Sequence, residues 1–359
     1  MSSSSLTRAA VLREHFVSPN FRQRPILTSL NGDNAWLVSF PRPDAEAKAA
    51  GRSYFHVVSD PWLVGPMVVA NSWVFMMTAP SPPAFQDGAA VEQLAQEIED
   101  AAATAAIARG KPNKTREQAA DSESPVVGAV FISLSLSDHM HEPTLRSFDR
   151  RIPVVAVPEA AKAIEGWGHF DTVLATQDLA PTRTENWQVV HPGPPLPPWL
   201  NVFRIPGHQS LNFAMAWIWT RDDGHREAIL LSPHGIRQDQ PAFRAFLEMC
   251  QSEDQKISVL AMLHGLKESF TYGFRNTLGV AGGLALDKAA RPRYWVRSHD
   301  CVPTYTGLIG WFTRDFPRSL LDGITEYTGM QKTGVPPDEE DDHRPNLVDI
   351  ENGESFILE

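Results

Sequence analysis

Short apolar runs rich in β-branched and aromatic residues recur along this chain, and helical patterns separate the later ones. Runs of this length bounded by Gly, Pro, Asn or Asp are typical of strands. They cover residues 35–40, 54–59, 126–132, 154–157, 211–219, 228–231, 257–262 and 294–297. Strands that alternate with helices favour a layered α/β or α+β protein over an all-β sandwich.

Helical periodicity fills several of the gaps between these runs. Residues 159–165 end at Gly166, and residues 241–251 follow Asp239, which can cap a helix. Residues 88–108 place a further apolar stripe on one helical face, whereas the stretch after them has no hydrophobic period. We therefore interpret residues 86–124 as an insertion made of a surface helix and a mobile loop.

The length of 359 residues is enough for one large domain with a substantial core. We predict a single domain over residues 21–330, preceded by an N-terminal extension over residues 1–20. Residues 331–359 contain five acidic residues at positions 338–342, so they are predicted to be a flexible acidic tail.

Charge and cysteine content narrow the class of partner and the compartment. The formal net charge of −11 disfavours binding to nucleic acid or to an anionic membrane. Only 2 cysteines are present, which is typical of a reducing compartment. No apolar stretch has the length of a signal peptide core or a membrane span. We therefore expect a cytoplasmic protein that acts on a small molecule.

Polar side chains gather just outside the predicted strands. Loops at strand ends are held in place by a rigid sheet, so functional groups often collect there. A single histidine is more often structural than functional, but the repetition of this placement favours a shared cleft. The residues concerned are Asp60, Asp138, His139, His208, His234 and His299.

The order of these motifs resembles the metallo-β-lactamase fold superfamily, and most closely its plant and fungal members related to bacterial ascorbate-lactone hydrolases. The resemblance runs from about residue 27 to residue 308. It rests on "LNGDNAWLVSF", "VVSDPWLVGP", "VVGAVFISLSLSDHMHEPTL", "IPVVAVPEAAKAIEGWGHFDTV", "IPGHQS", "LLSPHG" and "YWVRSHDC". It implies an αββα sandwich of two mixed sheets flanked by helices, with the cleft at one end.

The resemblance also implies a set of metal ligands. In the family a His-x-His-x-Asp-His loop helps to bind two metal ions, because imidazole and carboxylate are good zinc donors. Asp138 and His139 match the Asp-His pair of that loop. His208 matches a Pro-Gly-His histidine, His299 matches the last histidine, and His234 falls where a bridging aspartate is expected.

The two leading histidines of the family loop fall on Leu134 and Leu136, and leucine has no lone pair to offer. The first metal site therefore keeps at most His208. The second site keeps Asp138, His139 and His299, with His234 as a further nitrogen donor. Two interpretations stay open: the site binds one Zn²⁺ or other divalent metal ion, or it binds no metal.

Each interpretation predicts a different chemistry for Asp138, His139, His234 and His299. With a metal, the resemblance implies hydrolysis of an ester, lactone or amide in a small organic molecule. Without one, the same residues would serve isomerisation, dehydration or cyclisation by acid and base catalysis, as in secondary metabolism. A non-catalytic binding module is the third possibility.

A few neighbouring residues complete the predicted site. Trp62, Trp73, Leu134 and Leu136 are candidates to line an apolar substrate pocket. Asp60 has two open interpretations, as a hydrogen-bond partner of a ligating imidazole or as a simple turn residue.

Overall fold

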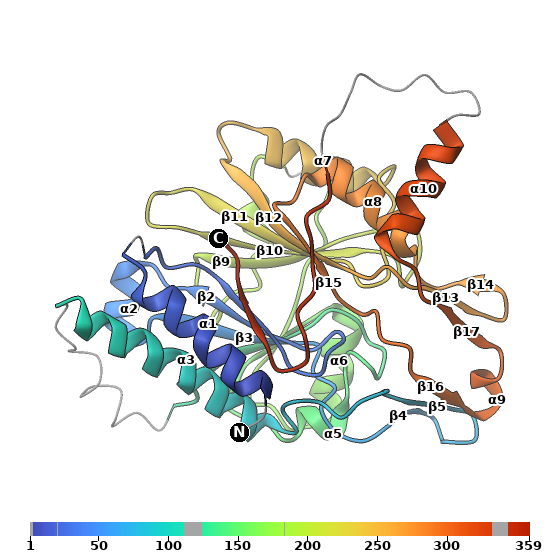
Figure 1. Cartoon of the computed structure of the whole chain (residues 1–359), viewed down its shortest axis with the longest axis horizontal. Helices are drawn as coiled ribbons and strands as arrows, with labels where there is room; N and C mark the ends of the chain where they lie inside the picture. The colour runs from blue at the N-terminus through green and yellow to red at the C-terminus, as the bar shows by residue number, and fades with distance from the viewer. Residues whose placement is uncertain (1–2, 20, 111–123, 183, 332–343) are drawn as a thin grey trace.

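Two large sheets pack face to face between helices in the computed structural model (Figure 1), which describes residues 3–19, 21–110, 124–182, 184–331 and 344–359. The first is seven-stranded, in the order β19-β1-β2-β3-β6-β7-β8. Its strands are β1 (Ile26–Ser29), β2 (Trp36–Pro41), β3 (Tyr54–Ser59), β6 (Val127–Ile132), β7 (Val154–Ala156), β8 (Val173–Ala175) and β19 (Ser355–Ile357).

The second sheet is six-stranded, in the order β18-β15-β12-β11-β10-β9. Its strands are β9 (Leu200–Ile205), β10 (Ala214–Thr220), β11 (Arg226–Leu231), β12 (Ile257–His264), β15 (Tyr294–Arg297) and β18 (Leu347–Val348). Both sheets are mixed. Strands β3, β6, β7 and β8 run parallel, as do β11, β12, β15 and β18. Loops that leave the carboxyl ends of parallel neighbours emerge at one edge, where ligands commonly bind.

The main hydrophobic core lies between the two sheets and receives side chains from both. The ring of Phe40 lies 5.2 Å from that of Trp219, and Phe131 lies 5.7 Å from Trp217. These contacts join β2 and β6 of the first sheet to β10 of the second. Strands covered on both faces have near-continuous apolar sequences, which is why these runs were recognisable as strands.

Helices cover the outer faces. On the first sheet lie α3 (Gly88–Ala108) and α6 (Pro158–Gly166), and α7 (Pro241–Gln251) and α8 (Gly279–Ala290) lie on the second. The predicted helices within residues 88–108, 159–165 and 241–251 are confirmed. The remaining helices are α1 (Ser3–Val17), α2 (Asp44–Ala50), α5 (Glu142–Leu145), α9 (Gly307–Gly310), α10 (Leu320–Gln331) and the 3₁₀ helix η1 (Trp187–Val190).

Two further three-stranded sheets lie beside the sandwich, and we call them together the cap. The first contains β4 (Met67–Val69), β5 (Phe75–Thr78) and β16 (Thr304–Thr306). The second contains β13 (Glu268–Thr271), β14 (Phe274–Arg275) and β17 (Thr313–Phe316). Figure 1 shows the cap strands together on one side of the molecule, near α9. The sequence did not predict these strands.

Residues near both ends of the chain pack onto the sandwich. The N-terminal extension forms α1, and its Leu12 and Phe16 are buried in the main core. The tail departs from the prediction of flexibility over residues 344–359, because β18 extends the second sheet and β19 extends the first. The acidic residues 338–342 and the predicted loop residues 111–123 lie outside the described residues. No helix in the described ranges is long and apolar enough to cross a bilayer.

Candidate metal centre

Three buried histidines meet at the edge where the parallel strands of both sheets end. His139 follows β6, His234 follows β11 and His299 follows β15. Each can offer one ring nitrogen such that the three nitrogens lie within 4.8 Å of one another. The chain therefore brings together donors that are far apart in sequence, and it draws them from loops of both sheets.

The orientation of His139 is set by Asp60. The Nδ1 atom of His139 lies 3.0 Å from Oδ2 of Asp60, which accepts its proton. Asp60 also accepts hydrogen bonds from the backbone N–H and hydroxyl of Ser133, so its carboxylate is itself held in place. Of the two roles left open for Asp60, the structure shows the one as hydrogen-bond partner of an imidazole. Because Nδ1 faces Asp60, Nε2 is the ring nitrogen left for a metal ion, and it is buried without a hydrogen-bond partner.

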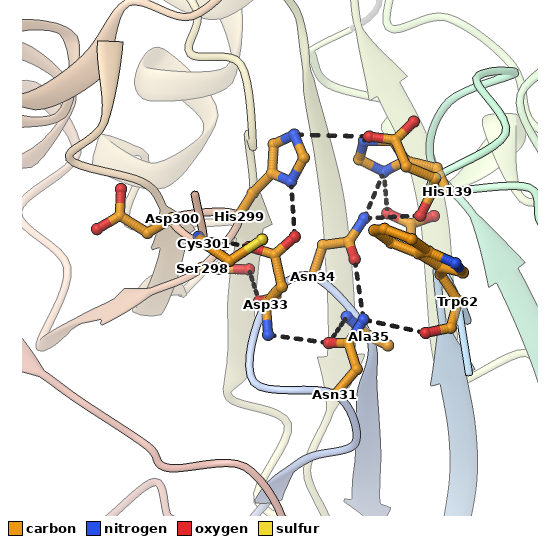
Figure 2. A network of polar contacts seen from close by, with 12 residues as sticks. Asn31, Asp33, Asn34, Ala35, Trp62, His139, Ser298, His299, Asp300 and Cys301 are labelled. Carbon is orange, nitrogen blue, oxygen red and sulfur yellow. Dashed lines mark hydrogen bonds and ion pairs between the residues drawn. The ribbon is translucent and has the colours of Figure 1, made fainter. Parts of the chain in front are cut away.

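His234 and His299 follow the same pattern. Nδ1 of His234 donates to the carbonyl of Asn276 at 3.3 Å, and its Nε2 is buried without a partner. Nδ1 of His299 donates to Oδ2 of Asp33 at 3.3 Å, as Figure 2 shows. Metal-binding histidines typically donate their second ring N–H to a carboxylate or carbonyl, which fixes the tautomer. All three histidines therefore have the arrangement expected of ligands.

Asp138 supplies a carboxylate to the same group. Its Oδ2 lies 3.7 Å from Nε2 of His139 and 3.9 Å from Nε2 of His299, which is too long for hydrogen bonds. Its Oδ1 is buried without a partner. Unpaired buried polar atoms are rare because leaving them unsatisfied costs free energy. Three imidazoles around a common point, with a carboxylate beside two of them, fit a divalent metal ion such as Zn²⁺.

The electrostatic surroundings favour positive charge at this point. Burial lowers the pKa of His139, but the carboxylates of Asp138 and Asp60 outweigh it and raise this pKa to about 9. His234 behaves in the opposite way, because burial and the neighbouring His299 and His139 hold its pKa well below the usual value. Without a metal the centre therefore holds its positive charge on His139, and a metal ion would replace that proton.

Residues of the turn between β1 and β2 form hydrogen bonds with residues of the centre. Asp33 accepts the backbone N–H of Cys301 at 2.9 Å in addition to the ring of His299. Asn34 donates its side-chain amide to the carbonyl of Asp138 at 3.0 Å. Figure 2 shows this turn lying between His299 and His139. Burial raises the pKa of Asp33, but the interaction with His299 outweighs it and holds the pKa well below its usual value.

Sequence reasoning missed Asp33 and Asn276 as partners of the histidines. The Asn-Gly-Asp-Asn turn before β2 was visible as a turn signal, but nothing local showed that its aspartate faces a residue more than 250 positions away. Asn276 acts through its backbone carbonyl, so its side-chain identity carried no signal.

The other predicted metal ligand, His208, lies elsewhere. It is half-buried and does not belong to the group of converging donors among the described residues. Burial and the charge of Arg237 lower its pKa. The two leucines at the missing ligand positions also differ from each other. Leu134 packs in the main core with 4% exposure, whereas Leu136 is 37% exposed.

A cavity of about 280 Å³ opens beside the histidines and is walled by the cap. Its lining includes Asp138, His234 and His299 from the candidate metal centre, together with Leu136. Trp62 is buried under the cap and Trp73 is 67% exposed, and neither is among the described residues that line the cavity. The apolar lining predicted for tryptophan is instead supplied by Met67, Val69, Phe75, Met77, Leu136, Leu211 and Pro303.

Comparison with known proteins places the fold. No protein-family model and no curated protein sequence matches the chain. An isothiocyanate hydrolase from Delia radicum gut bacteria matches with 12% identity and a TM-score of 0.50, over 92% of this chain and 98% of that chain. A possible metal-dependent hydrolase from Veillonella parvula matches with 9% identity and a TM-score of 0.50, over 93% and 99%.

The metallo-β-lactamase fold protein YhfI from Bacillus subtilis also matches, with 9% identity and a TM-score of 0.41, over 93% of this chain and 99% of that chain. Identities this low speak for the fold alone. The layering of two mixed sheets between helices is the metallo-β-lactamase fold that the sequence resemblance implied. The fold and the convergent donors define a metallo-β-lactamase-fold protein with one candidate metal centre.

Proposed function

We propose that this protein is a hydrolase that binds one divalent metal ion, with zinc as the expected metal, and cleaves an ester, lactone or amide bond of a small organic molecule. One observation carries the proposal. The three histidines each commit Nδ1 to an oxygen acceptor, and their remaining nitrogens converge beside an unpaired carboxylate. Two proteins of similar fold, an isothiocyanate hydrolase and a possible metal-dependent hydrolase, also support it.

The site residues have different roles in the proposed hydrolysis. His139, His234, His299 and Asp138 would hold the metal ion. When bound, such an ion supplies Lewis acidity, which lowers the pKa of water so that it becomes nucleophilic near neutral pH. Asp60 and Asp33 keep two of the imidazoles in the ligating orientation. Asp138 also lines the cavity, so its second oxygen can hold the proton released during hydrolysis.

The leucines limit the number of metals. Leu134 is buried among apolar side chains, and His208 is not among the converging donors in the described part of the chain. A second metal ion would therefore lack its ligands. The proposal is for a single metal ion, in contrast to the two that the family motif supports.

One observation favours a second candidate function, a metal-independent enzyme that moves protons. His139 has a raised pKa of about 9 while His234 has a pKa well below the usual value, and their rings lie 5.8 Å apart. Neighbouring groups whose pKa values are pushed apart can serve as an acid and a base. The same cleft would then catalyse an isomerisation, a dehydration or a cyclisation of the kind found in secondary metabolism.

Hydrolysis of a panel of aryl esters, lactones and anilides tests the main proposal. Exchange of His139 or His299 for Ala should lower kcat/KM by about 100-fold or more, because each removes a donor and leaves its partners unpaired. The control is His225→Ala, since this histidine lies at the β10–β11 turn, where it contacts Ser258. Full activity in both site variants would overturn the assignment of the centre.

A further inference from the structure

A buried ion pair forms part of the cavity wall. Nζ of Lys267 lies 3.2 Å from Oδ2 of Asp315, and the two side chains are 6% and 1% exposed. The ammonium also donates to the carbonyl oxygen of Cys301. Lys267 is the one Lys or Arg that lines this cavity among the described residues. The one Lys or Arg side chain in the described cavity lining is therefore already paired.

The cap holds this pair in place. The hydroxyl of Tyr305, on β16, donates to Oδ2 of Asp315, on β17, at 2.8 Å. Burial lowers the pKa of Lys267, but the charges of Asp33 and Asp315 outweigh it and raise this pKa. Lys267 therefore keeps its charge at neutral pH, and that charge is neutralised within the wall.

The remaining charged lining is acidic. Asp33 and Asp138 face the cavity, and His299 is the hydrogen-bond partner of Asp33. The two charges of a bound divalent metal ion would be offset by the three carboxylates around the histidines, those of Asp33, Asp60 and Asp138. A negatively charged substrate group would therefore meet these carboxylates without a free cationic side chain to receive it. Burial of a charge without a partner is costly. The apolar side chains of β4 and β5, among them Met67, Phe75 and Met77, favour hydrocarbon in the same space.

We propose that the pairing of Lys267 with Asp315 leaves the cavity without a free cationic side chain, so that the cavity accepts uncharged, mainly apolar small molecules and rejects anionic ones. This inference rests on the proposed function, which identifies the cavity as the substrate site. The volume of about 280 Å³ lies just below the range of roughly 300–1,000 Å³ typical of sites for drug-sized ligands, so the substrate is small.

Binding of two matched probes to the zinc-loaded full chain tests the inference without any need for turnover. Benzyl methyl sulfone is uncharged, whereas phenylmethanesulfonate has almost the same shape and one negative charge. Neither group is a strong zinc ligand. We expect the sulfone to bind at least about tenfold more tightly than the sulfonate in a calorimetric titration.

Removal of one partner should change this preference in a defined direction. In Asp315→Asn the charge of Lys267 is no longer neutralised, so the affinity for the sulfonate relative to the sulfone should rise about tenfold. The double variant Lys267→Met/Asp315→Leu removes both charges and should keep the wild-type preference for the sulfone. If the buried unpaired lysine prevents folding of the first variant, this second variant decides: a double variant that binds the sulfonate as tightly as the sulfone overturns the inference.

The inference is overturned if the wild-type chain binds both probes equally, binds neither, or prefers the sulfonate. It is also overturned if folded Asp315→Asn leaves the ratio of affinities unchanged. These outcomes differ from a failure of the proposed function. A chain that selects the sulfone but binds no zinc and cleaves no ester would retain the specificity and lose the hydrolase assignment.

Discussion

At the scale of single residues, the centre depends on which ring nitrogen of each histidine carries the proton. Asp60, Asn276 and Asp33 each accept from Nδ1, and the Nε2 atoms are thereby left as donors to a metal. The geometry of the acceptors is therefore as important as the histidines themselves.

Asp60→Asn tests this dependence. The amide lacks the negative charge that holds the Nδ1 proton of His139, and loss of such a partner typically lowers metal affinity about 10–100-fold. Competition for zinc with a chromophoric chelator measures the change. Asp171→Asn is the matched control, because that carboxylate pairs with Arg150 on the surface. Equal zinc affinity in the two variants would show that Asp60 has no part in ligand orientation.

The replaced ligand positions give a second test. Leu134 has 4% exposure inside the core, so Leu134→His buries an imidazole without a partner and should lower the free energy of unfolding by about 2–4 kcal/mol. Leu136 is 37% exposed, so Leu136→His should cost under about 1 kcal/mol. Urea denaturation measures both. A Leu134→His variant as stable as the wild type would contradict the packing of this position in the core.

Only part of the site was predictable from these residues. Asp138 and His139 follow directly on an apolar strand, so local sequence was enough to mark them as candidates. His234 and His299 also follow strands. Lys267 and Asp33 gave no such signal, since their importance comes from partners that only the folded chain brings near, namely Asp315 and His299.

At the scale of secondary-structure elements, helix α3 is fixed to the first sheet by a buried polar network. The carboxylate of Glu99 accepts from the backbone N–H groups of Ser53 and Tyr54, at 2.7 Å each. It also lies 3.2 Å from Nε2 of His56, whose Nδ1 lies 2.8 Å from the hydroxyl of Ser39. The helix thus supplies hydrogen-bond acceptors to the backbone at the start of β3 and to His56 within that strand.

Glu99→Ala should therefore destabilise the whole fold. It leaves two backbone donors and Nε2 of the buried His56 unpaired. Loss of one partner from such a network costs about 3–5 kcal/mol. Glu97→Ala on the same helix removes a carboxylate that is 58% exposed, and it should cost under about 1 kcal/mol. Chemical denaturation compares the two. Similar losses in both variants would mean that the network does not anchor α3.

The predictability of the elements follows from their burial. Long strands covered on both faces, such as β6 and β12, were visible as apolar runs, and α3, α6 and α7 were visible from their periodicity. The cap strands are short, and β5 pairs with β16, more than 200 residues away. Such pairing has no local signature. The same holds for β18 and β19, which were predicted to be part of a flexible tail.

At the scale of the whole molecule, the centre joins the two sheets. His139 and Asp138 follow a strand of the first sheet, while His234 and His299 follow strands of the second. The cap closes over the same edge and forms the cavity wall. The fold thus brings a candidate metal centre and an apolar pocket to one place, which is the arrangement that the proposed hydrolysis requires.

The metal content of the purified chain tests the central claim most directly. After growth with zinc and removal of loosely bound metal, elemental analysis should find about one equivalent of a divalent metal per chain, because the residues that the structure describes contain one set of converging donors. The double variant His139→Ala/His299→Ala should lose it, and His225→Ala should keep it. Less than about a tenth of an equivalent in the wild-type chain, where a structural zinc site would be nearly full, would contradict the account.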